Sequence, residues 1–384
     1  MTRPTAVRSD PFIRRLRLRD FRSWEHLDLE AGPLPVVLTG ANGSGKTNLL
    51  EAVSLLAPGR GLLGARLADL PRRGGPGSWS VVADVTAGHA TTRVGTGAPG
   101  DDDTKGRLVR VDGENCRGQA PLAGIVSLMW LTPSMDGLFR EPAQHRRRFF
   151  DRMVCVHDPL HARRIGAYER AMRERLRLLR EMSRDIAWLA ALEGTMAETG
   201  VAVAAARREF RDLLAPVLAA GTAPFPGAAL DLAGLVETWI ADMPAVDVET
   251  RFREHLEAAR RRDAEQGMTG EGPHRMDLLV HHLEAGMEAT LCSTGQQKAL
   301  VIAILMASAR LAGGHRAPVL LLDDVISHLD HEARESLLAL ILDLGLQAWM
   351  TGTDRDLFDI LDRKALFFQV TAGSARRLEV RAAA

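Results

Sequence analysis

Runs of apolar residues predict the elements of the N-terminal part of the chain. Within residues 12–30 leucines alternate with polar residues, a pattern that is typical of paired strands and predicts a hairpin. Residues 34–39 form a continuous apolar run that leads into a glycine-rich turn, and residues 46–57 then place leucines and a valine at helical spacing. Residues 95–106 are predicted to form a loop. Further strands are predicted at 79–85, 107–111 and 126–131, the first two antiparallel.

The middle of the chain is predicted to be helical, and its last part to alternate between strand and helix. Residues 140–184 contain thirteen arginines and six acidic residues, and an apolar stripe from Ile165 to Leu179 predicts one long helix with many of the arginines on its solvated faces. Alternation of strands and helices after residue 276 predicts a largely parallel sheet. The other helices are predicted at 195–218, 248–266, 298–312 and 332–344, and the strands at 318–322 and 346–350.

Charge and composition limit the classes of protein that fit. Forty-nine basic and forty-nine acidic residues give a formal net charge of zero, so any nucleic-acid surface must be a local patch. Cys116, Cys155 and Cys292 form no CxxC pair, which argues against a disulfide framework or a zinc site. The longest apolar stretch is too short to span a bilayer, so we expect a cytoplasmic protein with no membrane partner. Trp130 and Trp188 are expected in the core.

A glycine-rich segment between the predicted strand at 34–39 and the following helix fits the P-loop pattern of nucleotide-binding proteins. Glycines let the backbone wrap closely around phosphate, and exposed amides at a helix start attract the anion. Lys46 would reach the terminal phosphates of ATP, and the Thr47 hydroxyl would bind Mg²⁺. The alternative is a plain glycine-rich turn. The predicted ATP-binding residues are Gly40, Ala41, Asn42, Gly43, Ser44, Gly45, Lys46 and Thr47.

Two carboxylates follow the apolar strand predicted at 318–322. Asp323 is expected beside the P-loop, where it would hold Mg²⁺ together with Thr47. Asp324 would accept a proton from the attacking water and so act with Lys46 in catalysis. The alternative is a pair of acids that caps the next helix.

The segment Ser-Thr-Gly-Gln at 293–296 stands just before a predicted helix, where by itself it would be an ordinary helix cap. The order of P-loop, Ser-x-Gly-Gln segment, acidic strand end and Ser-His-Leu-Asp segment at 327–330 resembles the ATP-binding-cassette superfamily. The resemblance implies that Ser293, Gly295 and Gln296 contact nucleotide held by a second copy, which makes the ATPase dimeric. Asp330 would belong to a loop at the dimer interface.

Within that superfamily the chain resembles the RecF family. The residues that carry the resemblance are 18–22 (LRDFR), 47–52 (TNLLEA), Pro133, 146–151 (RRRFFD), 272–275 (GPHR), 293–298 (STGQQK), 320–325 (LLLDDV) and 351–354 (TGTD). The implied fold is α/β: a P-loop ATPase head with a mixed sheet and an antiparallel β subdomain, plus an inserted α-helical arm. The expected segments are 1–140 and 271–384 for the two halves of the head and 141–270 for the arm.

The resemblance also implies a function and partners. The protein would be a weak ATPase, stimulated by DNA, that dimerises on ATP binding and binds double-stranded DNA, gapped DNA and junctions between single strand and duplex. With RecR and RecO it would help RecA replace single-strand-binding protein, in replication restart and the SOS response. It would be associated with the nucleoid.

The chain departs from the pattern of related ATPases at a few positions. Thr353 stands where transporter ATPases have a switch histidine, so slow hydrolysis is expected. Met276 interrupts the acidic pair that usually follows Pro-His-Arg, which leaves the role of Asp277 open. The arginine-rich arm is either an ordinary solvated surface or a phosphate-binding one. Its candidate DNA contacts are Arg163, Arg164, Arg173, Arg177 and Arg180.

Three other functions stay open from the sequence. The chain could be a transporter-type ATPase subunit, although the inserted arm and Thr353 disfavour this. It could be a structural DNA clamp with negligible hydrolysis, because the same residues bind and hydrolyse ATP. A small-molecule P-loop kinase would leave the segment at 293–296 unexplained.

Overall fold

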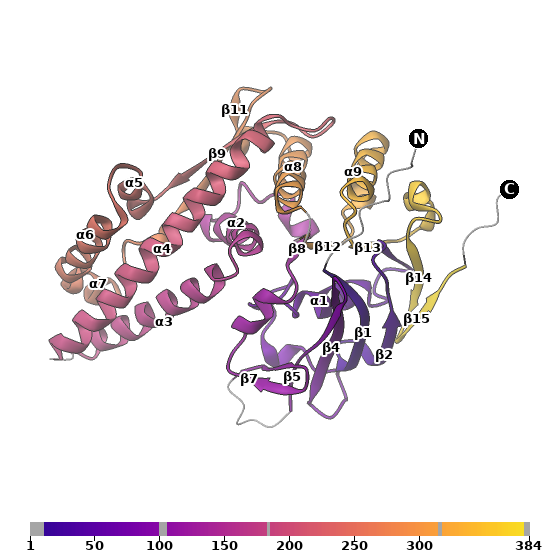
Figure 1. Cartoon of the computed structure of the whole chain (residues 1–384), viewed down its shortest axis with the longest axis horizontal. Helices are drawn as coiled ribbons and strands as arrows, with labels where there is room; N and C mark the ends of the chain where they lie inside the picture. Colours follow the sequence, from indigo (N-terminus) through magenta and orange to yellow (C-terminus); the bar gives the residue numbers. More distant parts are fainter. Residues whose placement is uncertain (1–10, 100–105, 183–184, 314–316, 380–384) are drawn as a thin grey trace. The chain divides into compact units, whose positions relative to one another are not determined.

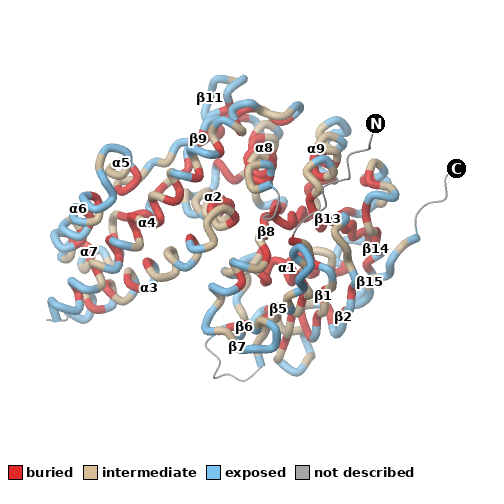
Figure 2. Tube along the Cα trace, viewed as in Figure 1, coloured by how far each residue is buried: buried red, intermediate tan, exposed pale blue. Residues whose placement is uncertain are grey.

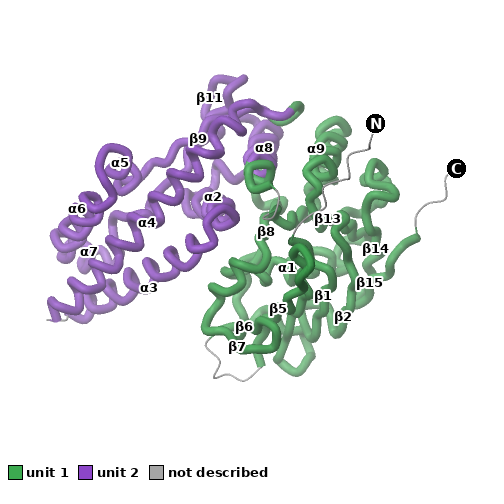
Figure 3. The backbone as a smooth tube through the Cα atoms, viewed as in Figure 1, with its two compact units in different colours: residues 1–136, 223–225, 308–384 green, residues 137–222, 226–307 purple. Residues whose placement is uncertain are grey.

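The computed structural model describes residues 11–99, 106–182, 185–313 and 317–379. Its contacts divide the chain into two compact units, the first made of residues 1–136, 223–225 and 308–384 and the second of residues 137–222 and 226–307 (Figure 3). The helical unit therefore includes residues 271–307, which we expected in the C-terminal half of the head. No helix in these described ranges is both long and apolar enough to cross a membrane.

The first unit contains an antiparallel sheet with the strand order β2-β1-β4-β5-β6-β7 (Figure 1). Leucines of the first strand point into the core and its arginines point outward, as the alternating pattern predicts. The predicted hairpin at 12–30 is confirmed. The strands are β1 (Phe12–Phe21), β2 (Trp24–Glu30), β4 (Trp79–Ala87), β5 (Ala90–Ala98), β6 (Leu108–Val111) and β7 (Glu114–Cys116).

Strand β5 corrects the loop that was predicted at 95–106. Its last residues pair with β4 and β6, while residues 100–105 of that loop lie outside the described residues. Glycines usually weaken a strand, which is why the sequence pattern failed here. At Gly97, however, any Cβ would collide with the backbone carbonyl of Trp79, so the close approach of β4 and β5 requires glycine.

The second sheet of this unit has the order β15-β14-β3-β13-β12-β8 and is parallel except for the terminal pair of β14 and β15. This confirms the predicted parallel sheet. Every residue of β3, β8, β12 and β13 is buried, as continuous apolar runs require. The strands are β3 (Val36–Thr39), β8 (Leu128–Leu131), β12 (Val319–Leu322), β13 (Ala348–Gly352), β14 (Leu366–Thr371) and β15 (Ser374–Arg377).

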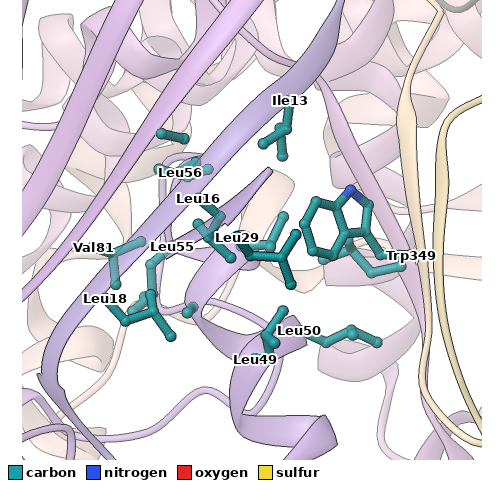
Figure 4. Packing of buried hydrophobic residues seen from close by; sticks show 14 of the residues in the cluster. Ile13, Leu16, Leu18, Leu29, Leu49, Leu50, Leu55, Leu56, Val81 and Trp349 are labelled. Atoms are coloured by element: carbon teal, nitrogen blue, oxygen red, sulfur yellow. The ribbon is translucent and has the colours of Figure 1, made fainter. Parts of the chain in front are cut away.

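One apolar core joins the two sheets of the first unit. Figure 4 shows Leu49 and Leu50 of the first helix among side chains of β1 and Trp349 of β13, and all of them are fully buried. This packing holds the start of that helix at the end of β3. The helices of the unit are α1 (Lys46–Ser54) and α9 (His331–Asp343), with short 3₁₀ turns at η1 (Leu67–Asp69), η2 (Ala120–Gly124), η3 (Pro133–Met135), η7 (Ile326–His328) and η8 (Arg355–Leu361).

The second unit is mostly helical and has a small antiparallel sheet of order β11-β10-β9. The helix predicted at 195–218 begins earlier, at Ile186, and the one predicted at 248–266 is divided in two. The elements are α2 (Ala143–His157), α3 (His161–Arg180), α4 (Ile186–Ala219), β9 (Ala228–Ala233), α5 (Leu235–Asp242), α6 (Ala245–Ala258), α7 (Arg260–Gln266), η4 (Pro273–Arg275), β10 (Asp277–His282), β11 (Met287–Glu288), η5 (Ala289–Leu291) and α8 (Thr294–Ala312), whose residues from 308 belong to the first unit.

Burial confirms one tryptophan prediction and contradicts the other. Trp130 is buried in β8, whereas the Trp188 side chain near the start of α4 is 52% exposed, so its expected place in the core was wrong. Figure 2 colours residues at that end of α3 and α4 as exposed. Trp188 lies in the first turn of α4, where its backbone N–H bonds to the cap residue Asp185. A position so close to a helix end gives the ring few neighbours to pack against.

One arginine of α3 lies outside the expectation that many arginines of this helix occupy its solvated faces. Arg175 is fully buried, and its guanidinium donates to Glu193 of α4 at 2.9 Å and to Asp263 of α7 at 2.7 Å. It also donates to the Leu256 carbonyl of α6 at 2.6 Å. One buried cation therefore connects four helices, which the helical pattern of α3 alone does not reveal.

Replacing this cation should destabilise the helical unit. We expect Arg175→Met to lower the free energy of unfolding by about 3–5 kcal/mol, because Asp263 is then buried without its arginine. Arg173→Met is the matched control on the same helix, since its ion pair with Glu169 is exposed and should contribute less than about 0.5 kcal/mol. Urea unfolding followed by circular dichroism measures both. Equal effects of the two variants would contradict the prediction.

Candidate functional site

The glycine-rich segment at 40–47 adopts a conformation that only glycines permit. Gly40, Gly43 and Gly45 have φ angles of 149°, 79° and 103°. A Cβ at Gly40 would collide with the carbonyl of Val370 in β14, and one at Gly45 would lie 2.7 Å from the Ser23 hydroxyl. Helix α1 begins immediately afterwards, so its unpaired N-terminal amides face the loop. The segment thus has the backbone that phosphate binding requires.

Lys46 is folded back onto this loop. Its ammonium donates to the carbonyls of Gly40 at 2.6 Å and Ala41 at 2.9 Å. Partial burial lowers the pKa of Lys46, and the nearby carboxylates of Asp324 and Asp323 oppose that effect. The cation is therefore held within the loop next to the two acids that the sequence singled out.

The structure brings Thr47 and Asp323 together from positions far apart in the chain. The Thr47 hydroxyl donates to Oδ1 of Asp323 at 2.9 Å. Burial raises the pKa of Asp323, while hydrogen bonds from Thr351 and Thr47 counteract the rise. A hydroxyl and a carboxylate are hard oxygen donors of the kind that Mg²⁺ prefers, so this pair fits the predicted metal site.

Asp324 follows with a backbone that non-glycine residues rarely adopt. Its φ angle is 51°, in the left-handed region, and its N–H donates to the Thr351 hydroxyl at 2.8 Å. The Asp324 side chain is 42% exposed, and its Oδ2 lies 3.4 Å from Nε2 of His328 in η7. Neither Thr351 nor His328 had an individual role predicted from the sequence. The signal that could have indicated Thr351 is the pairing of β12 with β13. Leu322 lies opposite Met350, so the next residues, Asp323 and Thr351, lie beside each other.

The turn of the β1–β2 hairpin is fastened to the P-loop helix. Arg22 binds Glu51 through two hydrogen bonds of 2.7 and 2.8 Å, and the Glu51 side chain is fully buried. Asn48 donates to the Ser23 hydroxyl at 2.9 Å, and the Trp24 indole N–H donates to the Gly45 carbonyl at 3.3 Å. Two of the motifs that suggested a family, 18–22 and 47–52, are thus in direct contact.

The segment at 293–297 lies in the helical unit and caps α8. Ser293 and Gln296 bond reciprocally, the Ser293 N–H donating to Oε1 of Gln296 at 2.9 Å and the Gln296 N–H to the Ser293 hydroxyl at 3.3 Å. Gln297 and Arg140 both donate to the Cys292 carbonyl, at 2.9 and 3.0 Å. The segment therefore caps the helix, as the alternative interpretation predicted. Ser293 and Gly295 are nevertheless exposed at the surface.

Asp330 is also a helix cap. It is exposed, and its carboxylate accepts a hydrogen bond of 2.8 Å from the Ala333 N–H at the start of α9. Thr353 is exposed beyond the end of β13, with its hydroxyl 3.4 Å from the Asp354 carboxylate.

Buried ion pairs surround the Pro-His-Arg segment at 273–275. Arg207 of α4 donates to the Pro273 carbonyl at 2.7 Å and pairs with Asp151 of α2 and Glu237 of α5. Burial alone would raise the pKa of Asp151, but Arg207 and His161 lower it below its ordinary value. Asp277, whose role the sequence left open, is an ion-pair partner of Arg146, because both its oxygens accept hydrogen bonds of 2.7 Å from that guanidinium.

His274 in the same segment is held as a neutral imidazole. Burial lowers the pKa of His274 to about 4. Its Nε2 lies 3.1 Å from the Thr269 carbonyl, which can only accept, so Nε2 carries the proton. Nδ1 therefore accepts the hydrogen bond of 2.7 Å from the Tyr168 hydroxyl.

Four of the five candidate DNA contacts already have partners. Arg164 pairs with Asp158, Arg173 with Glu169, and Arg177 with both Glu174 and Glu181, while Arg180 donates to the Gly267 carbonyl. Arg163 is exposed and makes no side-chain hydrogen bond or ion pair within the described ranges.

Comparisons with known proteins identify close relatives. The sequence family described as AAA domain matches residues 15–61. The DNA replication and repair protein RecF of Rhizobium rhizogenes (strain K84 / ATCC BAA-868) is 48% identical over 94% of this chain and 97% of its own length. The protein of the same name from Rhizobium meliloti (strain 1021) is 46% identical over 94% of this chain and 98% of its own length.

Solved structures share the fold at lower identity. A structure of the recombination mediator protein RecF with ATPrS superposes with a TM-score of 0.82 at 20% identity, covering 98% of this chain and all of that one (100%). An Smc head domain with an extended coiled coil, from Pyrococcus furiosus, gives a TM-score of 0.55 at 14% identity, covering 96% of both chains. The chain therefore has the α/β fold of the RecF and Smc ATPase heads, as the resemblance implied.

The neutral His274 makes stability depend on pH. An unfolded histidine with a pKa of 6.5 binds a proton as the pH falls toward 4, whereas the folded one does not, so the free energy of unfolding should drop by up to about 3 kcal/mol over this range. His274→Gln keeps both hydrogen-bonding groups and removes the titration. Urea unfolding at several pH values should show a smaller loss in the variant, and identical slopes would contradict the assignment.

Proposed function

The chain belongs to the RecF family of DNA replication and repair proteins, and on this basis we propose that it is an ATPase that dimerises on binding ATP and clamps duplex or gapped DNA. The observation that carries the proposal is the hydrogen bond of 2.9 Å between Thr47 and Asp323. It joins the P-loop to the acidic end of β12, as nucleotide and Mg²⁺ binding require. The RecF structures with ATP and with ATPrS support the choice of nucleotide.

The residues around the P-loop have distinct roles in this proposal. Backbone amides of residues 40–47 bind the phosphates, and Lys46 leaves the Gly40 and Ala41 carbonyls to reach the terminal ones. Thr47 and Asp323 would hold Mg²⁺, which neutralises charge on the phosphates when bound. Asp324 is exposed enough to take the proton of the attacking water.

We assign the segment at 293–296 to the dimer. Ser293, Gly295 and Gln296 would contact the nucleotide of a second copy, and Asp330 would lie at the interface between copies. Support comes from the exposure of Ser293 and Gly295 at the start of α8, since a helix N-terminus attracts phosphate. ATP would then act as the link between two heads.

DNA and the partner proteins complete the proposal. Phosphate contacts would come from the arm, with Arg163 the foremost candidate because its charge is not neutralised by a neighbour in the described chain. Arg164, Arg173, Arg177 and Arg180 would contribute less, since each must first give up a partner. Family membership supports RecR and RecO as partners in helping RecA onto single strands, and a place in the nucleoid.

ATP hydrolysis and DNA binding can be tested in one assay. We expect slow phosphate release from ATP with Mg²⁺ that increases with linear or gapped duplex but not with single strand. Lys46→Met should lower the rate by at least about 100-fold, because the terminal phosphates lose their cation.

The outcomes separate the parts of the proposal. Release that persists in Lys46→Met would indicate a contaminating ATPase. Release that depends on Lys46 but is indifferent to every DNA would keep the ATPase and contradict the clamp. A structural clamp with negligible hydrolysis would instead bind ATP and DNA without releasing phosphate.

The dimer can be tested at the α8 cap. We expect Ser293→Arg to abolish ATP-dependent dimerisation in light scattering, because a long cation replaces the small hydroxyl that would face the partner's nucleotide. Thr290→Arg is the matched control, as it adds the same side chain at an exposed position in η5 outside the segment. If Ser293→Arg dimerises with ATP like the parent, contact through this segment is disproved.

A further inference from the structure

The hydroxyl of Thr351 touches both acids at the end of β12. It donates to Oδ1 of Asp323 at 2.9 Å and accepts from the backbone N–H of Asp324 at 2.8 Å. A hydroxyl has one proton to donate and lone pairs to accept, so this arrangement satisfies both of its capacities. The Thr351 residue is only 1% exposed, which means that water cannot replace either bond.

Strand pairing fixes Thr351 in this place. Strands β12 and β13 are parallel neighbours with Leu322 opposite Met350, so Asp323 and Thr351 follow at the same level. All five residues of β13 are buried, which holds the strand and its threonine rigidly in the sheet.

The two bonds determine how the acids are presented. Thr47 and Thr351 both donate to Oδ1 of Asp323, and within the described ranges Oδ2 accepts no hydrogen bond. Oδ2 therefore remains available to a ligand. The hydrogen bond from the Asp324 N–H to the Thr351 hydroxyl restrains the left-handed turn at Asp324, whose φ of 51° is unfavourable for a residue with a side chain. That turn sets the direction in which the Asp324 carboxylate leaves the sheet.

We propose that Thr351 is a positioning residue for ATP hydrolysis, because one buried hydroxyl orients the Asp323 carboxylate and the Asp324 backbone together. This inference rests on the proposed function. It differs from the assignment of Thr353 to the switch position, which the resemblance implied. Thr353 is exposed, and its hydroxyl bonds to Asp354 rather than to Asp323 or Asp324.

Three substitutions test the proposal in the full-length chain. Thr351→Val has nearly the same shape but neither donates nor accepts, so it should lower kcat by about 10- to 100-fold. Thr351→Ser keeps the hydroxyl and should retain at least about half of the parental kcat. Thr371→Val is the matched control, an exposed threonine at the end of β14 in the same sheet, and should leave kcat unchanged.

Nucleotide binding gives a readout besides turnover. Without Mg²⁺, the affinity for ATP in equilibrium titration should stay within about twofold of the parent in all three variants, because the P-loop itself is unaltered. The gain in ATP affinity on adding Mg²⁺ should be smaller in Thr351→Val alone, since the Asp323 carboxylate has lost its orientation.

The results distinguish this proposal from the one on which it rests. A parent chain that binds and hydrolyses no ATP would refute the proposed function, and the role of Thr351 with it. A parent that hydrolyses ATP with a folded Thr351→Val of equal kcat would refute only the positioning role. If Thr351→Val does not fold, the serine variant decides, and a loss of more than about tenfold in kcat there overturns the proposal.

Discussion

The candidate site depends on the parallel arrangement of β3, β12 and β13, whose carboxyl ends share one edge of the sheet. Segments that are remote in the chain then follow those ends: the P-loop after β3, the acids after β12 and Thr351 within β13. Because every residue of these strands is buried, a shift in register would pull the polar residues that follow a strand, such as Asp324 after β12, into the apolar layer. Hydrophobic packing thus sets the distance between Thr47 and Asp323.

The part of this arrangement that is local in sequence could be predicted. A strand followed by glycines and a helix predicts the P-loop, and an apolar strand that ends in acids predicts Asp323 at the same edge. The contacts that depend on pairing between distant segments could not. Thr351 reaches the acids only through the register of β12 against β13, and Arg22 reaches Glu51 only because a hairpin packs on α1.

Arg175 shows what helical periodicity leaves undetermined in the arm. An amphipathic pattern sorts residues by type and favours a solvated face for arginine, but it does not identify which arginine is buried. Arg175 is inside because Glu193 and Asp263, contributed by two other helices, neutralise it. Likewise Arg207 binds Asp151, Glu237 and the Pro273 carbonyl. A buried ion pair adds little net stability, because both charges lose their hydration. It does disfavour other arrangements of the helices, since an arrangement that separates the two partners would leave an unpaired charge in the core.

Ion pairs also reduce the positive charge that the arm could offer to DNA. An arginine that is already balanced by a carboxylate must lose that pair before it can bind phosphate, so its net contribution is small. The excess of arginine at 140–184 therefore overstates the positive charge that DNA would meet, because Arg164, Arg173 and Arg177 are paired with acids. In a chain with a formal net charge of zero, the proposed DNA binding would then depend on those cations of the described residues that have no acidic neighbour, such as Arg163. The proposed dimer would present each of them twice, which is a physical reason for DNA affinity to follow ATP-dependent dimerisation.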